Sequence, residues 1–334
     1  DLALTEAARM NAIRIHHFGD ADVRRYEYAP DPGAGPGEAV VAVKAIGVNP
    51  VETYIRAGIH LIRPELPFIP GSDAAGVVLS VGDGVGNLKP GDRVYAAGCV
   101  GPDAWEGAYA EQLLRRAEDL LPLADNLSFA QGAALGVPYG TAQWALIHRG
   151  RAQAGETVLI HGASGAVGTA ALQIAAAHGI TTIGTAGSER GLDLVRQHGA
   201  AHALDHTKDG YLDAVAELTD GKGPQIILEM LANVNLARDM EVVAKYGRIV
   251  IIGNRGPIEI NAREAMMKEL DLIGIALPNA TAGEMAEIHD ALGKGLADGS
   301  LDPVIGKELP LAEAIEAHHA VLRPGAYGKI VLIP

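Results

Sequence analysis

The pattern of apolar and polar positions divides the chain into two kinds of sequence. Up to about residue 130, short apolar runs such as residues 40–43 and 92–95 are separated by Gly, Pro and Asp. This punctuation is typical of all-β domains and predicts a β-barrel. Ser128, with Gln131 three residues later, has the pattern of a capping box, so a helix is expected to begin there, to be interrupted at Pro138 and to resume before His148.

From residue 157, strand-like runs alternate with helical ones. The apolar runs begin near residues 157, 181, 202, 226, 248 and 272, at intervals of 21 to 24 residues. One strand plus one crossover helix has this length, so the six units predict a doubly wound parallel sheet with helices on both faces. We expect a helix over residues 282–296 and a last strand over residues 329–333.

These patterns predict an α/β protein of two domains. A β-barrel domain is expected over residues 1–131 and a nucleotide-binding parallel sheet over residues 132–276. The remaining residues, 277–334, are expected to return to the first domain. Residues 1–9 precede Met10 and a strand-like run, so we interpret them as a leader from an earlier start or a remnant of cloning.

Composition narrows the classes of function. The 334 residues include 27 Lys and Arg against 41 Asp and Glu, a net charge of −14, which disfavours nucleic acid and anionic membranes as partners. Cys99 is the one cysteine, so an intramolecular disulfide and a cysteine-rich zinc cluster are excluded, and a reducing cytoplasm is expected. The long apolar stretch over residues 158–186 contains polar residues and glycines, so we interpret it as buried core rather than a membrane span.

A glycine-rich turn lies between the first apolar strand and the first helix of the second domain. Residues 161–168, His-Gly-Ala-Ser-Gly-Ala-Val-Gly, form a dinucleotide fingerprint with alanine in the first glycine position. Gly165 allows the backbone to approach a pyrophosphate, Gly168 allows the helix to pack on the strand, and the helix N-terminus favours the anion. The alternative is a tight strand-to-helix turn without a ligand. The five further units favour nucleotide binding.

The second strand ends without the carboxylate that usually binds the ribose of NAD. Small residues occupy this place, and Gly187, Ser188 and Arg190 follow them. Ser188 and Arg190 are therefore candidates to bind a 2′-phosphate, which predicts NADP(H) as the cofactor. In the alternative interpretation Glu189 binds the ribose and Arg190 is a solvated helix residue.

Read as a whole, the chain resembles the zeta-crystallin-like quinone oxidoreductases of the medium-chain dehydrogenase/reductase superfamily. The resemblance runs from Met10 almost to the last residue. It rests on the strings at residues 47–56, 70–73, 132–134 with 138–139, 161–168, 229–236, 252–256 and 259–261. It implies a GroES-like barrel built from both chain ends around a Rossmann domain, NADPH as cofactor, no flavin, and a homodimer or tetramer formed by edge pairing of sheets.

The resemblance also implies a set of cofactor contacts. These are Tyr54, Ser164, Gly165, Ala166, Val167, Gly187, His206, Asn235, Ile252, Gly253, Asn254 and Arg255, to which we add Thr141 beside the nicotinamide and Lys329 at the phosphate. Each has an alternative: His206 as a loop residue, Asn235 as a helix cap, Arg255 as an ion-pair partner, Tyr54 as barrel packing, Thr141 as a helix-lining residue and Lys329 as a solvated lysine.

The ligands of the superfamily's zinc alcohol dehydrogenases have no counterpart here. Their catalytic zinc is bound by Cys and His, whereas the corresponding positions carry Asn49 and the residues 71–73, Gly-Ser-Asp. The histidines His60, His148, His161 and His202 lack ligand spacing. We therefore expect a metal-free enzyme whose substrate accepts electrons readily.

A quinone meets this demand, because its ring delocalises the incoming charge. The resemblance favours ortho-quinones, in some relatives reduced by one-electron steps to the semiquinone. We assign Asn49 as a donor to a quinone oxygen and Tyr54 as donor or stacking partner; the alternative for Asn49 is a turn residue before Pro50.

Two other functions remain open from the sequence. The same architecture could reduce the double bond of an enal or enone, or serve without catalysis as a crystallin or an RNA-binding protein. The loop at residues 98–107, with Cys99 and Trp105, is longer than is usual in the family and is a candidate to line the cleft.

Overall fold

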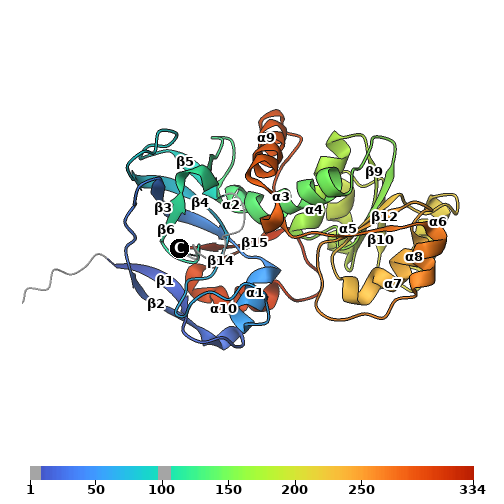
Figure 1. Cartoon of the computed structure of the whole chain (residues 1–334), viewed down its shortest axis with the longest axis horizontal. Helices are drawn as coiled ribbons and strands as arrows, with labels where there is room; N and C mark the ends of the chain where they lie inside the picture. Colours follow the sequence, from blue (N-terminus) through green and yellow to red (C-terminus); the bar gives the residue numbers. More distant parts are fainter. Residues whose placement is uncertain (1–8, 97–106) are drawn as a thin grey trace, which may run out of the picture. The chain divides into compact units, whose positions relative to one another are not determined.

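The computed structural model describes residues 9–96 and 107–334, which form two compact units (Figure 1). The first unit runs up to Val137 and also includes Pro303–Arg323 and Lys329–Pro334. The second unit comprises Pro138–Asp302 and the short segment Pro324–Gly328. Cys99, Trp105 and most of the loop 98–107 lie outside the described residues.

The first unit is built around a seven-stranded sheet. Its strands follow the order β14-β15-β3-β4-β5-β7, and β6 pairs with β3. The central strand β3 pairs with β6 through residues 38–42 and with β15 through residues 46–47. The strands are β3 (Glu38–Gly47), β4 (Asp73–Val81), β5 (Arg93–Ala96), β6 (Gln112–Arg116), β7 (Leu120–Pro122), β14 (Ile305–Pro310) and β15 (Lys329–Ile333).

The remaining elements of this unit cover the sheet. A hairpin of β1 (Arg9–Ile15) and β2 (Arg24–Pro30) contributes apolar side chains, and α1 (Pro50–Ala57), α2 (Phe129–Gly132) and α10 (Ala314–Ala320) are its helices. Ala39, Val41 and Val43 alternate into one buried cluster with Leu113 and Leu332, as half-buried strands require. The expected capping box is confirmed: Ser128 Oγ accepts from Gln131 N, and Gln131 Oε1 accepts from Ser128 N.

The second unit contains the predicted six-stranded parallel sheet. Its order, β10-β9-β8-β11-β12-β13, reverses between β8 and β11, as in a doubly wound sheet. Each strand begins within two residues of the position that the apolar runs predict. The strands are β8 (Thr157–Ile160), β9 (Thr181–Ala186), β10 (His202–Asp205), β11 (Ile226–Glu229), β12 (Arg248–Ile251) and β13 (Asp271–Gly274).

Helices pack on both faces of this sheet. Ile183 joins Val215 of α6 and Leu236 of α7 in one core, whereas the adjacent Gly184 faces Leu172 of α4 and Val195 of α5. Neighbouring residues of a strand point to opposite faces, so α4 and α5 lie on one face and α6 and α7 on the other. The helices are α4 (Ala166–Ala177), α5 (Glu189–Gln197), α6 (Tyr211–Leu218), α7 (Ala232–Val242) and α8 (Ala262–Lys268).

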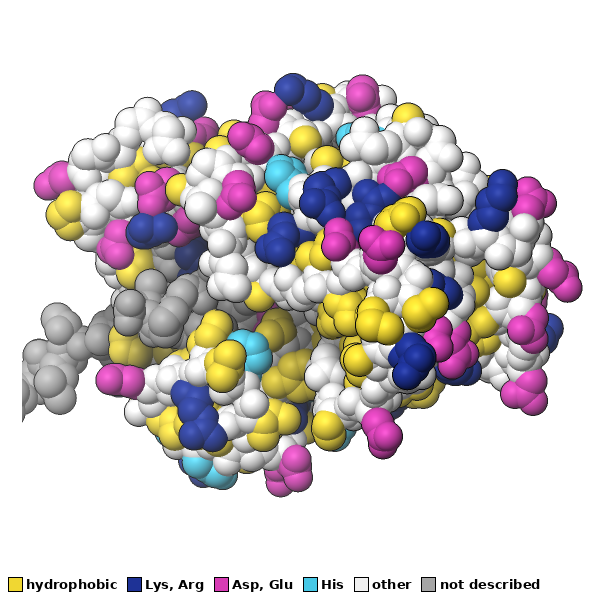
Figure 2. Space-filling model, turned by 45° about the vertical axis from the view of Figure 1, so that its right-hand side comes forward, with side chains coloured by type: hydrophobic (Ala, Val, Ile, Leu, Met, Phe, Trp, Pro, Cys, Tyr) yellow, Lys and Arg dark blue, Asp and Glu magenta, His cyan; other side chains and the backbone are white. Residues whose placement is uncertain are grey.

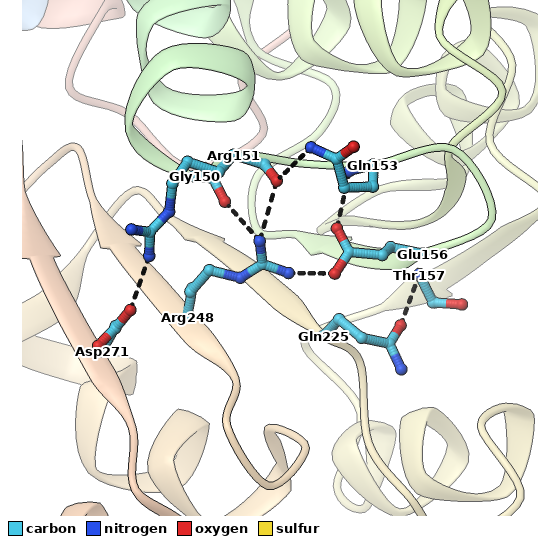
Figure 3. A network of polar contacts seen from close by, with 8 residues as sticks. All are labelled: Gly150, Arg151, Gln153, Glu156, Thr157, Gln225, Arg248 and Asp271. Atoms are coloured by element: carbon cyan, nitrogen blue, oxygen red, sulfur yellow. Dashed lines mark hydrogen bonds and ion pairs between the residues drawn. The ribbon is translucent and has the colours of Figure 1, made fainter.

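A polar network ties the starts of the strands together at the amino edge of the sheet (Figure 3). Arg248, the first residue of β12, pairs with Glu156 and donates to the carbonyl oxygens of Gly150 and Arg151. Arg151 pairs with Asp271 of β13 at 2.8 Å. This edge is thus occupied by the protein's own side chains, and ligands of such sheets bind at the opposite, carboxyl edge.

The division of the chain differs from the expected boundaries in two places. The segment after Val137, with α3 (Gly140–Gln143) between two π-helical stretches, packs against α4 and α9 (Ala282–Asp298). The predicted helix at 282–296 is therefore present, but it belongs to the second unit, and only the chain from Pro303 returns to the first. Among the described residues, no helix is long and apolar enough to span a bilayer.

Candidate functional site

The carboxyl edge of the parallel sheet gathers most of the predicted cofactor residues. The glycine turn follows β8, Gly187 and Ser188 follow β9, His206 follows β10, and residues 252–255 follow β12. Because all six strands are parallel, these turns meet at the same edge of the sheet. Asn235 reaches this edge from the first turn of α7, after β11.

The glycine turn has the geometry that its sequence predicts. A Cβ on Gly168 would lie 2.5 Å from the Ala163 Cα, so only glycine allows α4 to pack this close to the strand. Gly165 is the N-cap of α4 and carries no side-chain cap, and Ala166 and Val167 open the helix. The backbone N–H groups at this helix start are therefore available to an anion.

The segment 324–328 packs on the glycine turn. Ser164 Oγ donates to the Ala326 carbonyl oxygen at 2.6 Å, and Gly328 N donates to the Ser164 carbonyl oxygen at 2.7 Å. Ser164 is buried, so its hydroxyl is committed to this contact. The next side chain along the segment, Tyr327, stacks on Arg190, whose guanidinium carbon lies 3.8 Å from the ring centroid.

The end of the second strand carries the residues that were predicted to bind a 2′-phosphate. Ser188 caps α5 by accepting from Gly191 N at 3.1 Å, and Arg190 lies exposed in the first turn of the helix. Glu189, the alternative ribose ligand, pairs with Arg196 at 3.3 Å on the surface of the same helix. The carboxylate is therefore held by a neighbouring arginine, while the Arg190 guanidinium is oriented by Tyr327.

His206 and Gly187 lie against each other beside this corner. A Cβ on Gly187 would lie 2.9 Å from His206 Nε2, so glycine is required for the ring to approach. His206 Nδ1 is 3.1 Å from Thr185 Oγ1, and burial lowers the pKa of the imidazole. A neutral imidazole here offers a hydrogen bond and no net charge.

The fourth and fifth strands end in a tightly connected turn. A Cβ on Gly253 would lie 2.1 Å from the Met230 carbonyl oxygen, and Gly253 N donates to the Glu229 carbonyl oxygen. Asn235 lies within α7, whose N-cap is Leu231, so it is not the cap of this helix. Its Nδ2 donates to Glu229 Oε1 at 3.2 Å. Ile252, Asn254 and Arg255 complete the turn, and Thr141 is buried in α3.

A second polar cluster is buried in the first unit, around Asn49. Asn49 precedes α1 and is 3% exposed. Its Oδ1 accepts from Lys329 Nζ at 2.6 Å, and its Nδ2 donates to Asp73 at 2.9 Å and to Glu52 at 3.2 Å. Lys329 Nζ also donates to Asp73 Oδ2 at 2.8 Å.

Lys329 is therefore buried, and the alternative interpretation, a solvated lysine, is wrong. It is 2% exposed and lies in the first unit, where its ammonium holds Asn49 and Asp73 together. Its contact with a cofactor phosphate stays a prediction. Tyr54 is half-buried on α1, one turn after Asn49.

The cluster continues through Glu52 to the buried residues Tyr109 and His318. Tyr109 OH donates to Glu52 Oε2 at 2.7 Å and lies 3.1 Å from His318 Nε2, and Arg56 donates to His318 Nδ1. Burial and two neighbouring arginines hold the pKa of His318 well below its usual range, so the ring is neutral and its Nε2–H donates to Tyr109. Burial raises the pKa of Glu52, although the hydrogen bonds that it accepts from Tyr109 and Asn49 act in the opposite direction.

Sequence reasoning missed several of these residues. Tyr327, Glu52, Tyr109 and His318 were assigned no role from the sequence. Tyr327, Tyr109 and His318 lie far along the chain from the residues they contact. The partners of the Arg190 and Lys329 side chains are 137 and 256 or more positions away. The capping-box spacing of Asn49 and Glu52 was the one local signal for this cluster.

Comparison with known proteins identifies the family of this architecture. The chain is 45% identical to the quinone oxidoreductase of Rattus norvegicus over 326 residues, which cover 97% of this chain and 98% of the rat protein. It is 43% identical to the quinone oxidoreductase of Homo sapiens over the same shares of both chains. The chain belongs to the quinone oxidoreductase family. It is therefore an oxidoreductase of the medium-chain dehydrogenase/reductase superfamily.

Solved structures of quinone oxidoreductases and related proteins share the fold. A quinone oxidoreductase of Pseudomonas syringae is 32% identical with a TM-score of 0.87, and covers 97% of this chain and 100% of its own. A mycobacterial protein in complex with NADPH is 28% identical with a TM-score of 0.88 over the same shares. The mycobacterial protein thus binds NADPH on the same fold.

Two family models match separate parts of the chain. Residues 35–125 match the alcohol dehydrogenase GroES-like domain, and residues 166–320 match the zinc-binding dehydrogenase domain. The expected fold, a GroES-like domain beside a Rossmann sheet, is confirmed.

The zinc-binding dehydrogenase domain is named after a metal, but the polar cluster of the first unit does not have the ligand set of a zinc site. The Lys329 ammonium is already hydrogen-bonded to both Asn49 Oδ1 and Asp73 Oδ2. An amide, a carboxylate and a bound ammonium do not fit the donor set of zinc.

Proposed function

We propose that this protein is an NADPH-dependent, zinc-independent quinone reductase that favours ortho-quinones. The family supports the quinone, since relatives that match nearly the full chain are quinone oxidoreductases. The observation that carries the choice of NADPH is the corner formed by Arg190, Ser188 and Tyr327. The Arg190 guanidinium stacks on Tyr327 in the segment after β9, where NAD-binding sheets usually carry the carboxylate that binds the ribose.

The carboxyl edge of the second unit supplies the residues that would hold the cofactor. The N–H groups at the start of α4 would bind the pyrophosphate, Ser188 and Arg190 the 2′-phosphate, and the turn at residues 252–255 with Asn235 the nicotinamide half. The bound cofactor supplies the reducing equivalents. The protein's part is to hold the two reactants in place, which requires neither flavin nor metal for a substrate that delocalises charge.

Asn49 and Tyr54 remain the proposed donors to the quinone. Both amide hydrogens of Asn49 already have acceptors, Asp73 and Glu52. A quinone oxygen would therefore have to replace one of these acceptors when it binds. Tyr54 lies one turn further along α1 and would act as a donor or a stacking partner.

The deciding experiment is NADPH consumption by purified, chelator-treated enzyme with phenanthrenequinone, with NADH and an enone in parallel. We expect rapid oxidation of NADPH by the quinone, unaffected by chelation and much slower with NADH. Oxidation only with the enone would move the assignment to double-bond reduction. Under anaerobic conditions, one NADPH consumed for every two quinones would support one-electron steps.

The remaining expectations stay proposals. We propose a homo-oligomer, dimer or tetramer, formed through β13; Leu272 in this edge strand and Met266 and Met267 in α8 are exposed. We propose a cytoplasmic enzyme that does not bind nucleic acid. On the face in Figure 2, basic side chains are accompanied by acidic ones, which weakens its attraction for a phosphate backbone.

A further inference from the structure

Three ionisable side chains are buried together under the cofactor edge of the second unit. His161 precedes the glycine turn, Glu229 ends β11, and Asp239 lies in α7. His161 Nε2 is 2.8 Å from Asp239 Oδ1 and 3.5 Å from Glu229 Oε2. The two carboxyl groups are fully buried and the imidazole is 4% exposed.

Two oxygen atoms of this cluster lack a partner. Among the described residues, Glu229 Oε2 and Asp239 Oδ2 have no hydrogen-bond donor, although one oxygen of each group is bonded. Two carboxylates this close cannot both remain ionised without a large cost, and a proton on one of them supplies the missing donor. Burial and the neighbouring Asp239 raise the pKa of Glu229 to about 8, and burial raises that of Asp239 to about 6.

Burial also lowers the pKa of His161, so the ring is neutral and its Nε2–H donates to the carboxylate of Asp239. This leaves the remaining proton on Glu229. The cluster is then a neutral imidazole, a carboxylate and a carboxylic acid, which carry a single negative charge.

Glu229 connects this cluster to the turns that would hold the cofactor. Its Oε1 accepts from Leu231 N and from Asn235 Nδ2, and its backbone oxygen accepts from Ile252 N and Gly253 N. His161 N donates to the Leu228 carbonyl oxygen directly before the glycine turn. A change in the charge or the position of the Glu229 side chain would therefore displace the ends of β8, β11 and β12 together.

We infer that His161, Glu229 and Asp239 form a buried positioning triad, in which one proton shared by the two carboxyl groups keeps the cofactor edge in its binding geometry. Loss of this proton in mildly alkaline solution places two negative charges side by side under that edge. Nicotinamide cofactor affinity should then fall. The inference depends on cofactor binding at this edge and not on the identity of the substrate.

The charged and titratable groups around the triad do not account for such a change. Tyr211 of α6 packs edge-on against His161, and burial raises its pKa to about 12. Arg238 of α7 lies over the ring of this tyrosine, with its guanidinium carbon 5.8 Å from the ring centroid. His206, beyond β10, has a lowered pKa and is already neutral. Glu229 is the group of this neighbourhood whose titration falls near pH 8.

The test is NADPH affinity, measured by nucleotide fluorescence from about pH 6.5 to about pH 9.5. For the unmodified protein we expect at least about a fivefold weakening across this range, the lower end of typical coupling between sites. Glu229→Gln reproduces the protonated acid at every pH, because its amide donates to Asp239 and its oxygen accepts from Asn235. Its affinity should be high and independent of pH.

Two further variants keep the test decisive. Glu156→Gln removes a paired carboxylate at the opposite edge of the same sheet, and it should keep the original pH profile. Asp239→Asn removes one of the two carboxyl groups, so two negative charges cannot form side by side, and the fall in affinity with pH should be lost. Circular dichroism confirms that each variant is folded.

Three results would overturn the inference. One is an affinity of the unmodified protein that does not change with pH, and another is an unaltered profile in Glu229→Gln. The third is stoichiometric zinc bound after incubation with Zn²⁺ and lost in Glu229→Gln, since a metal would then replace the proton. A protein that fails to reduce quinones still answers the question, because binding and not turnover is measured.

Discussion

At the scale of single residues, the ammonium of Lys329 is buried between Asn49 and Asp73. Lys329 begins a strand after a polar loop, and such lysines are usually solvated. Its burial depends on Asp73 and Asn49, which lie more than 250 positions away. Gly168 is the opposite case, because the fingerprint itself specifies both its turn and its close contact.

Replacement of Lys329 should show how much its ion pair contributes to stability. Lys329→Met leaves the buried Asp73 carboxylate without its cation, and removal of one partner of a buried pair costs about 3–5 kcal/mol. We expect a loss of this size in the free energy of unfolding in urea. Lys294→Met, which removes an exposed pair with Asp290, should change it by less than about 1 kcal/mol. Equal losses in the two variants would contradict a special role for the buried pair.

Replacement of Arg190 should separate the two nicotinamide cofactors. Arg190→Ala removes a charge-assisted contact worth about 1.5–3 kcal/mol, so KM for NADPH should rise about tenfold or more while KM for NADH stays unchanged. Tyr327→Leu removes the stacking partner and should cause a smaller rise in the same direction. Arg151→Ala, at the other edge of the sheet, is the control. An equal rise for both cofactors would argue against a 2′-phosphate at Arg190.

At the scale of elements, periodicity predicted the second unit well. The six strands begin within two residues of the predicted positions, because a buried parallel strand is a continuous apolar run. The helix interrupted at Pro138 was predicted in outline. Its two π-helical stretches, Leu135–Tyr139 and Trp144–Arg149, were not, because their extra residue per turn leaves no distinct pattern in so short a segment.

The turn after β12 tests whether close packing of elements shapes the cofactor edge. A methyl group at Gly253 would meet the Met230 carbonyl oxygen at 2.1 Å, so Gly253→Ala must displace the ends of β11 and β12. We expect a loss of stability of about 1–3 kcal/mol and weaker NADPH binding, measured by urea unfolding and fluorescence titration. Gly256→Ala is the matched control, since no atom lies within 4 Å of its added methyl group. Unchanged binding in Gly253→Ala would separate this turn from the cofactor.

At the scale of the whole molecule, the sequence predicted two domains and the return of the chain to the first. The return to the first domain was predicted at residue 277, whereas the first unit resumes at Pro303. The difference is α9, which has no strand partner in the sheet. Its packing on α3, more than 130 positions earlier in the chain, decides where it belongs. Amphipathic pattern alone does not indicate which core a helix joins.

The pairing of β15 with β3 has a consequence for synthesis on the ribosome. The strand β3 begins at Glu38, yet its neighbour β15 spans Lys329–Ile333 and is translated more than 280 residues later. Nearly all of the second unit, in contrast, is one continuous segment that emerges earlier. During synthesis, the first unit therefore has an unpaired strand edge until β15 has been translated. Such an edge is prone to aggregation and is a binding site for chaperones.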